Sequence, residues 1–217
     1  MARTFPRSRW RDVALYAIVT GSVARKNPID VVRRAAAGGA DAIQLREKEL
    51  SDRDLLELAK ASVDAAHEHD ALLVVNDRPD VAYMAKADGV HLGQGDLPPD
   101  QARNLLGPTA IIGVSAHSLE EAETADAAGA DYVAVGAVFP TSTKPEREAV
   151  GPGLVADVVE RVNAPVVAIG GITLSNVGRA MEVGCRCVCV CSAIISADDV
   201  EQATRELKKA ITSQKEV

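Results

Sequence analysis

The sequence predicts an α/β protein folded as a single (β/α)8 TIM barrel. Short aliphatic and β-branched runs alternate eight times with amphipathic helix patterns, which is typical of right-handed βαβ units and a parallel sheet. The 217 residues suffice for eight such units, and no linker or change of composition divides them. Aromatic residues make up only 3%, so small aliphatic side chains must fill the core, as in a sheet covered by helices on both faces.

The eight expected strands are bounded by Gly, Pro, Asp or Asn and lie at 14–20, 42–46, 71–76, 89–92, 110–115, 132–139, 165–170 and 187–192. An open doubly wound sheet is the alternative arrangement. It normally carries G-x-G-x-x-G after the first strand, where this chain has Thr20-Gly21-Ser22-Val23. We therefore expect one domain over 1–217, with 1–12 as a solvated leader or cap and 13–213 as the barrel.

The clearest helix patterns cover 28–37, 52–69, 119–128 and about 198–211. Pro28 suits the first turn of a helix, and Ser51 is a typical N-cap. Ser118 followed by Glu121 predicts a capping box, in which each side chain bonds the other residue's backbone.

Charge and hydropathy exclude several classes of partner. A net charge of −7 argues against a protein that coats nucleic acid or an anionic membrane, and no apolar run approaches the roughly 18–20 residues that span a bilayer. Arginines at 3, 7, 9 and 11 precede the apolar run 13–19, but that run has strand length and no clean cleavage site follows it. We expect a cytoplasmic protein without nucleic-acid or membrane partners. The sequence leaves open whether the chain forms a homo-oligomer.

Four cysteines alternate with other residues at Cys185, Cys187, Cys189 and Cys191. This spacing places them on one face of a strand, several Å apart, without the C-x2-C turn that metal sites use. We expect small buried apolar side chains and neither a metal site nor a disulfide.

Polar residues gather where strands end, which is where TIM barrels carry their chemistry. After the second strand, Gln44, Arg46 and Lys48 project to the same side, and two cations with an amide suit a diphosphate. An ordinary solvated run of charges is the alternative interpretation.

Two acidic residues follow neighbouring strands. Asp77 comes after Asn76, and Asp96 closes the segment after the fourth strand. One or two carboxylates together with substrate phosphate oxygens are a usual Mg²⁺ site, which makes Mg²⁺ the expected cofactor. Capping of the next helix or turn is the alternative role for each carboxylate.

The remaining strand ends supply donors to phosphate. The fifth strand ends at Ser115, and the sixth leads into Thr141, Thr143 and Lys144. The alternative is that this Thr-rich segment is an ordinary turn. After the seventh and eighth strands come Gly170-Gly171 and Cys191-Ser192, where backbone N–H groups form a recurrent monophosphate site in such barrels. Two anion sites at one end of the barrel call for two phosphorylated substrates.

At this level of detail the chain resembles thiamine phosphate synthases. The resemblance lies in Gln-Leu-Arg-Glu-Lys at 44–48, Asn-Asp at 76–77, Val-His-Leu-Gly-Gln-Gly-Asp at 90–96, Phe-Pro-Thr-Ser-Thr-Lys at 139–144, Gly-Gly-Ile at 170–172 and Ser-Ala-Ile at 192–194. The first and fourth motifs together are specific, whereas Gly-Gly-Ile and His-Leu-Gly occur in other barrels. The chain departs from the family at Ala137, where Pro is frequent, and at Cys189 and Cys191, where Val or Ile is usual.

The resemblance implies a role for each matching position. The pyrimidine diphosphate is expected to contact Gln44, Arg46, Lys48, Asn76, Ser115 and Lys144, with Leu45 and Glu47 in the same substrate-binding motif. Mg²⁺ is expected at Asp77 and Asp96. The thiazole phosphate is expected at Thr141, Ser142, Thr143, Gly171, Cys191 and Ser192. Arg46, Lys48, Lys144 and Ser115 are the residues expected to act in catalysis.

The family reaction joins 4-amino-2-methyl-5-hydroxymethylpyrimidine diphosphate to hydroxyethylthiazole phosphate, or to its carboxylated form, giving thiamine phosphate and diphosphate. The thiazole nitrogen attacks through a lone pair, which fits the lack of an obvious general base. The electron-rich aminopyrimidine can carry positive charge on its CH2, so we expect a dissociative displacement. Two alternatives remain: an isomerase of the thiazole that uses His117 as proton shuttle, although a lone histidine is usually a core or loop residue, and a non-catalytic binding protein for thiamine precursors.

Overall fold

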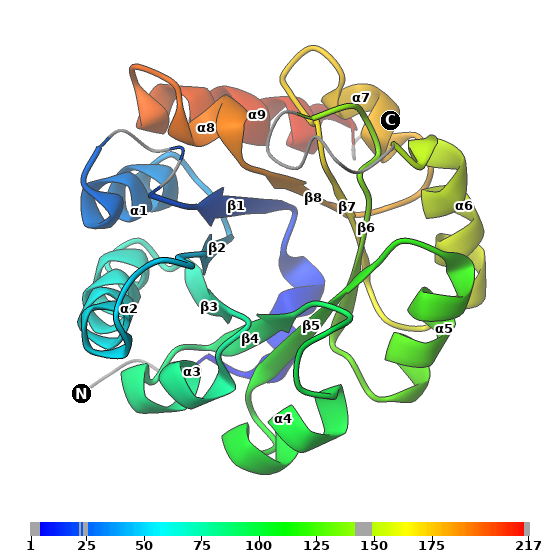
Figure 1. The fold of residues 1–217 in the computed structure, drawn as a ribbon. Helices are drawn as coiled ribbons and strands as arrows, with labels where there is room; N and C mark the ends of the chain where they lie inside the picture. The colour runs from blue at the N-terminus through cyan, green and yellow to red at the C-terminus, as the bar shows by residue number, and fades with distance from the viewer. Residues whose placement is uncertain (1–4, 22, 24–25, 142–148, 215–217) are drawn as a thin grey trace.

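The computed structural model describes residues 5–21, 23, 26–141 and 149–214, and its strands close into a barrel ringed by helices (Figure 1). The strands are β1 (Leu15–Val19), β2 (Ala42–Leu45), β3 (Leu72–Asn76), β4 (Gly89–Leu92), β5 (Ile111–Ala116), β6 (Tyr132–Val135), β7 (Val166–Ile169) and β8 (Cys187–Val190). Each strand pairs in parallel with the next, and β1 also pairs with β8, with Tyr16 opposite Cys189. This closure confirms the TIM barrel and excludes the open doubly wound sheet.

The outer ring consists of α1 (Pro28–Ala37), α2 (Asp52–His67), α3 (Pro79–Ala85), α4 (Pro99–Leu106), α5 (Leu119–Ala127), α6 (Gly151–Arg161), α7 (Val177–Met181), α8 (Ser192–Ile195) and α9 (Val200–Gln214). The Ser51 hydroxyl caps α2 as predicted, accepting from the Asp54 N–H at 3.2 Å. The capping box of α5 is half right: Ser118 accepts from the Glu121 N–H, but the Glu121 carboxylate accepts from the His117 N–H instead of that of Ser118.

Two strands end at least two residues earlier than the sequence predicts. β6 stops at Val135, because the following segment crosses to the end of β7, where the Phe139 N–H donates to the Gly170 carbonyl at 3.1 Å. β8 stops at Val190, and Cys191 serves as the N-cap of the short helix α8. Both corrections turn what was expected to be strand into the loops that surround one mouth of the barrel.

A repeated Ala-Asp pair aligns the strands at the opposite end. Asp41, Asp88 and Asp131 precede β2, β4 and β6, and each carboxylate accepts an N–H from the start of the preceding strand. The acceptor distances are 2.9 Å to Leu15 N, 2.7 Å to Leu73 N and 2.8 Å to Ile112 N. The position before β8 carries Arg186 instead. These carboxylates fix the starts of β1, β3 and β5, and therefore the heights at which their carboxyl ends meet.

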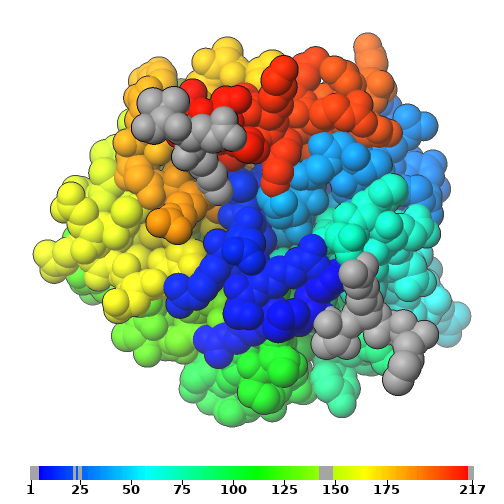
Figure 2. Space-filling model, turned by 180° about the vertical axis from the view of Figure 1, so that it is seen from behind, coloured from blue at the N-terminus to red at the C-terminus, as the bar shows by residue number. Residues whose placement is uncertain are grey.

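The N-terminal segment closes the barrel at this end. The 3-10 helix η1 (Arg7–Asp12) carries Trp10, which is 2% exposed and stacks on the Tyr132 ring with centroids 3.8 Å apart. Seen from behind, residues from this segment cover the centre of the molecular face (Figure 2). The expectation of a merely solvated leader is therefore wrong for Phe5 and Trp10, which are buried. Among the described residues, no helix combines the length and the hydropathy needed to cross a membrane.

The cysteines divide between the two sides of the sheet. Cys187 and Cys189 lie in the barrel interior with Tyr16 and Tyr132. Cys185 precedes the strand and packs outside the barrel, where its thiol donates to the Ala180 carbonyl at 3.0 Å. The prediction of a single face is therefore wrong for Cys185, because strand alternation begins only at Cys187. None of the four forms a disulfide within the described residues, and Cys185, Cys187 and Cys189 are buried.

Candidate active site

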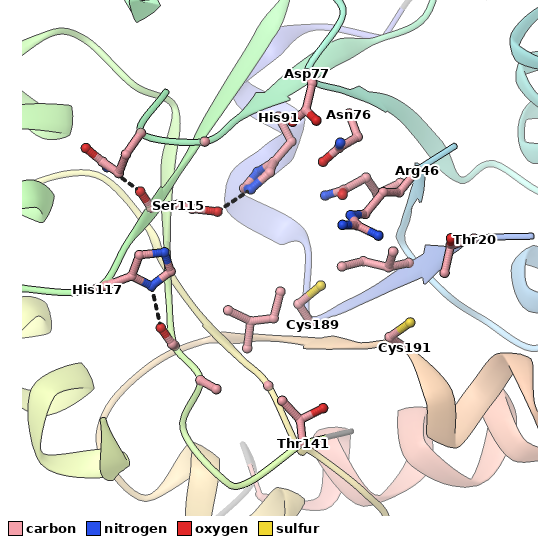
Figure 3. Close-up of a pocket in the computed structure, with 18 of the residues that line it drawn as sticks. Thr20, Arg46, Asn76, Asp77, His91, Ser115, His117, Thr141, Cys189 and Cys191 are labelled. Atoms are coloured by element: carbon pink, nitrogen blue, oxygen red, sulfur yellow. Dashed lines mark hydrogen bonds between the residues drawn. The ribbon is translucent and has the colours of Figure 1, made fainter. Parts of the chain in front are cut away.

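A cavity of about 300 Å³ opens at the carboxyl ends of the strands. Figure 3 shows side chains from β1 to β5 and from β8 converging on it, with Thr141 at the opposite edge. Most of the residues predicted from sequence line its wall: Gln44, Arg46, Lys48, Asn76, Asp77, Asp96, Ser115, Thr141, Gly171, Cys191 and Ser192.

One side of the cavity, which we call the carboxylate half, contains Arg46, Lys48, Asn76, Asp77 and Asp96. Lys48 Nζ lies 3.3 Å from Asp77 Oδ2. Asp96 accepts the Gly93 N–H at 2.6 Å. Burial, and then the neighbouring Asp77 carboxylate, raise the pKa of Asp96 above its ordinary value. The two acids thus lie side by side, as the sequence predicts from their neighbouring strands.

The local backbone explains how Asp77 reaches the cavity. Its N–H donates to the His91 carbonyl at 2.8 Å, which ties the end of β3 to β4. Asp77 has a φ of 63°, a left-handed conformation that Asp tolerates better than most residues. The chain therefore turns sharply at this position, and Asn76 and Asp77 both border the cavity (Figure 3).

The carboxylate half suits a small, hard divalent cation. Within the described parts of the chain, no cluster of three or more His, Cys, Asp or Glu side chains forms a complete metal cage. Two adjacent carboxylates beside open space are instead the donor set that Mg²⁺ uses when it keeps its waters and binds substrate phosphates.

The opposite side, which we call the glycine half, is formed by Thr141, Gly170, Gly171, Cys191 and Ser192. Gly171 has a φ of +64°, and a Cβ there would lie 2.5 Å from the Pro140 carbonyl oxygen. Only glycine lets the loops after β6 and β7 pack this closely. Burial raises the pKa of the Cys191 thiol to about 11, so this thiol stays protonated at neutral pH and is no nucleophile.

Five predicted site residues fall outside the cavity wall or outside the described residues. Leu45 is fully buried among residues of α2, α3 and α4, because strand alternation points it away from the barrel interior. The Glu47 carboxylate accepts the Gly21 N–H and does not line the wall. Ser142, Thr143 and Lys144 lie outside the residues that the structure describes.

Several wall residues were not among the sequence predictions, most notably Thr20, His91 and Gln94, and His117 was expected only in the isomerase alternative. Gln94 donates through Nε2 to the Ser115 carbonyl at 2.6 Å, and His117 Nδ1 lies 2.6 Å from the Gly136 carbonyl oxygen. The signal for His91 was present, because it alternates with Gly89 and Gly93 on the side of β4 that faces inward.

A continuous chain of side-chain hydrogen bonds crosses the barrel beneath the cavity. Gln44 Nε2 donates to Tyr16 Oη at 2.8 Å, and Tyr16 Oη lies 3.0 Å from Tyr132 Oη. Tyr132 Oη lies 3.0 Å from His91 Nδ1, and His91 Nε2 lies 2.8 Å from Ser115 Oγ. The last of these contacts is drawn in Figure 3. Both ends of the chain, Gln44 and Ser115, line the cavity.

A closed parallel barrel whose mouth holds cations, paired carboxylates and close-packed glycines is the arrangement of a TIM-barrel enzyme with an anion-binding site. The model of the family described as thiamine monophosphate synthase matches residues 15–194. The chain belongs to this family, whose members act on small phosphorylated substrates, and it is a transferase.

Known relatives agree with this assignment. The chain is 43% identical over 200 residues to the thiamine-phosphate synthase of Moorella thermoacetica, covering 91% of this chain and 95% of that protein. It is 42% identical over 210 residues to the chloroplastic thiamine biosynthetic bifunctional enzyme TH1 of Arabidopsis thaliana; the match covers 94% of this chain but only 40% of that longer protein.

A solved structure of thiamine phosphate pyrophosphorylase from Pyrococcus furiosus superimposes with a TM-score of 0.87 at 40% identity, covering 96% of this chain and 98% of that one. A 3-hexulose-6-phosphate synthase superimposes with a TM-score of 0.68 at 20% identity, which shows the shared fold alone.

Proposed function

We propose that the chain joins a hydroxymethylpyrimidine diphosphate to a hydroxyethylthiazole phosphate, carboxylated or not, and releases diphosphate. The observation that carries this proposal is the division of one cavity into the carboxylate half and the glycine half. A diphosphate with a bound cation fits the first, and a monophosphate held by backbone N–H groups fits the second. The reacting carbon and nitrogen then meet between them.

The displacement needs little from the protein as acid or base. The C–O bond between the pyrimidine CH2 and the diphosphate breaks, and its electron pair leaves with the oxygen. The thiazole nitrogen supplies its own lone pair to the new C–N bond, so no proton is removed. The electron-rich aminopyrimidine stabilises positive charge on its CH2 as the leaving group departs. A carboxylated thiazole would also lose CO2.

Catalysis then rests on stabilising the departing diphosphate and excluding water. Arg46 and Lys48 border the carboxylate half, and in this proposal they bind the diphosphate oxygens. Ser115 also lines the cavity, and its proposed role is to orient the pyrimidine ring. Lys144 remains a predicted diphosphate ligand from its sequence motif, since it lies outside the described residues.

Asp77 and Asp96 would hold Mg²⁺, which supplies positive charge to the diphosphate when bound. Their own part is to place that charge beside Arg46 and Lys48. In this arrangement Lys48 offsets the negative charge of Asp77, from which its Nζ is 3.3 Å away.

The isomerase alternative is less well supported by this cavity. His117, its candidate proton shuttle, does reach the wall, with Nδ1 held 2.6 Å from the Gly136 carbonyl oxygen. An isomerase of the thiazole phosphate, however, has no use for Arg46, Lys48 and two carboxylates as a set. The transfer reaction uses all of them.

We further propose that this reaction takes place in the cytoplasm, as expected from the sequence.

The decisive test mixes both purified substrates with the protein and Mg²⁺ and measures released diphosphate together with thiamine phosphate by chromatography. We expect stoichiometric formation of both products and none when either substrate or the cation is omitted. Binding of both substrates without product would show a non-catalytic binding protein. Interconversion of thiazole isomers in the absence of the pyrimidine would show the isomerase.

A further inference from the structure

Within the hydrogen-bond chain of Gln44, Tyr16, Tyr132, His91 and Ser115, each of the two phenols has a single hydrogen for its two contacts. Tyr16 and Tyr132 are fully buried, and burial raises the pKa of both phenols well above the ordinary value, so each keeps its one hydrogen. Each phenol oxygen therefore donates one hydrogen bond and accepts the other. The direction of the first contact consequently dictates the direction of every later one.

The direction can be followed from Gln44. Gln44 Nε2 donates to Tyr16, so the Tyr16 hydrogen must go to Tyr132. The Tyr132 hydrogen must then go to His91 Nδ1, which leaves the imidazole neutral with its hydrogen on Nε2. That hydrogen is donated to Ser115 Oγ. The Ser115 hydroxyl hydrogen is left to donate into the cavity, and the Gln44 amide oxygen is left to accept there.

We propose that this buried chain makes Gln44 and Ser115 a coupled acceptor and donor, which selects an aminopyrimidine over the corresponding oxopyrimidine. Tyr16, Tyr132 and His91 act as positioning residues in this scheme. The inference rests on the proposed function, because it takes the ring between Gln44 and Ser115 to be the pyrimidine.

The selection follows from the polarity of the two rings. An aminopyrimidine offers an exocyclic N–H to the Gln44 oxygen and a ring-nitrogen lone pair to the Ser115 hydroxyl. The oxo analogue offers an oxygen and a ring N–H, which is the opposite pattern at both positions. To bind it without an unpaired buried group, the protein must turn the Gln44 amide, reverse both phenols and move the His91 hydrogen together.

The tautomer of His91 tests the polarity without any assay of activity. In ¹⁵N-labelled protein without substrate, the His91 ring should show a protonated Nε2 and an unprotonated Nδ1, assigned by comparison with His91→Gln. A hydrogen on Nδ1, or on both nitrogens, at neutral pH overturns the proposal. This readout holds whether or not the chain makes thiamine phosphate, so it separates the inference from the proposed function.

Two variants test the coupling. Tyr132→Phe keeps the ring that stacks on Trp10 but interrupts the chain at its centre, and Tyr16→Phe interrupts it beside Gln44. Tyr83→Phe, on a side chain 61% exposed on α3, is the matched control. Dissociation constants for the amino and oxo pyrimidine diphosphates are measured with Mg²⁺ by calorimetry, and circular dichroism verifies folding.

We expect the parent protein and Tyr83→Phe to bind the amino form far more tightly. The preference for the amino form, expressed as the ratio of the two dissociation constants, should fall roughly tenfold or more in Tyr132→Phe and Tyr16→Phe. In these variants Gln44 and Ser115 can exchange donor and acceptor roles independently of one another. An equal affinity for both analogues in the parent protein contradicts the proposal. An unchanged ratio in both folded variants does so as well.

Discussion

At the scale of single residues, Asp77 and Asp96 are the pair on which the metal assignment depends. A carboxylate that repels its neighbour in the free protein becomes a ligand when a divalent cation lies between them. Lys48 cannot replace that cation, because its side chain is 58% exposed and, of the two acids, its Nζ forms an ion pair with Asp77. Cation binding in the carboxylate half should therefore require both Asp77 and Asp96.

Asp77→Ala should raise the Mg²⁺ concentration needed for half-maximal rate and lower kcat by roughly 10²–10³-fold, by analogy with the loss of one group that stabilises developing negative charge. Steady-state kinetics over a Mg²⁺ titration measures both effects. Asp64→Ala, which removes an exposed carboxylate on α2, is the control and should change neither. A near-normal kcat for Asp77→Ala at saturating Mg²⁺ would show that Asp77 is not a ligand of the metal.

Cys191 gives a pH-dependent prediction. Burial raises its pKa to about 11, so the thiol is protonated below that pH and the reactive thiolate appears only as pH rises toward 11. Alkylation by iodoacetamide, followed site by site with mass spectrometry, should be slow at pH 8 and accelerate about tenfold per pH unit through pH 10. A plateau in the rate below pH 9 would mean that Cys191 is an activated thiol.

At the scale of secondary-structure elements, small residues and short carboxylates decide how the strands meet. Gly113 on β5 lies against Tyr132 on β6, and a Cβ at Gly113 would overlap the phenol ring. Asp131, ahead of β6, is paired with Arg103 at 2.6 Å and accepts the Ile112 N–H. Gly113 and Asp131 do not line the cavity, yet both stabilise the packing of the strands that carry Ser115 and Tyr132.

Gly113→Ala should destabilise the fold by about 1–3 kcal/mol, because the added methyl group displaces a tightly packed ring. Thermal unfolding measures the loss. Gly153→Ala within α6 is the opposite case, since its Cβ would meet no atom within 4 Å, and it should stabilise by about 0.5 kcal/mol. Equal melting temperatures for the two variants would show that the β5–β6 packing is looser than the contacts indicate.

Asp131→Ala should cost about 1–3 kcal/mol in the free energy of unfolding, because it leaves the buried Ile112 N–H without its acceptor. Urea unfolding, with Asp64→Ala again as control, gives the difference. A loss no larger than that of the control would show that the carboxylate at this strand start contributes little to the fold.

At the scale of the whole molecule, much of the architecture was predictable, because alternating strand and helix patterns admit few parallel topologies. The strand positions and the residues at their carboxyl ends followed from period-two alternation, which brought Arg46, Asp77 and Asp96 to one cavity. Local patterns could not give the early end of β6, since it depends on the following loop packing against Gly170 and Gly171. Nor could they give the early end of β8, where Cys191 becomes the N-cap of the short helix α8.

The same reasoning explains the predictions that failed. Leu45 belongs to a substrate-binding motif in sequence, yet alternation between Gln44 and Arg46 turns it toward the helices. Trp10 lies in a basic leader, and only the three-dimensional contact with Tyr132 shows that it closes the barrel. The hydrogen-bond chain joins residues 16, 44, 91, 115 and 132, which are too far apart in sequence for any local pattern to connect.

The proposed reaction requires the carboxylate half to hold a diphosphate together with a divalent cation. A crystal structure with the pyrimidine diphosphate and Mn²⁺ in place of Mg²⁺ tests this, with the metal located by its anomalous scattering. We expect an anomalous peak bound by Asp77, Asp96 and diphosphate oxygens, with Arg46 and Lys48 contacting the same diphosphate. A diphosphate bound at Gly171 and Ser192, or a metal bound away from both acids, would contradict it.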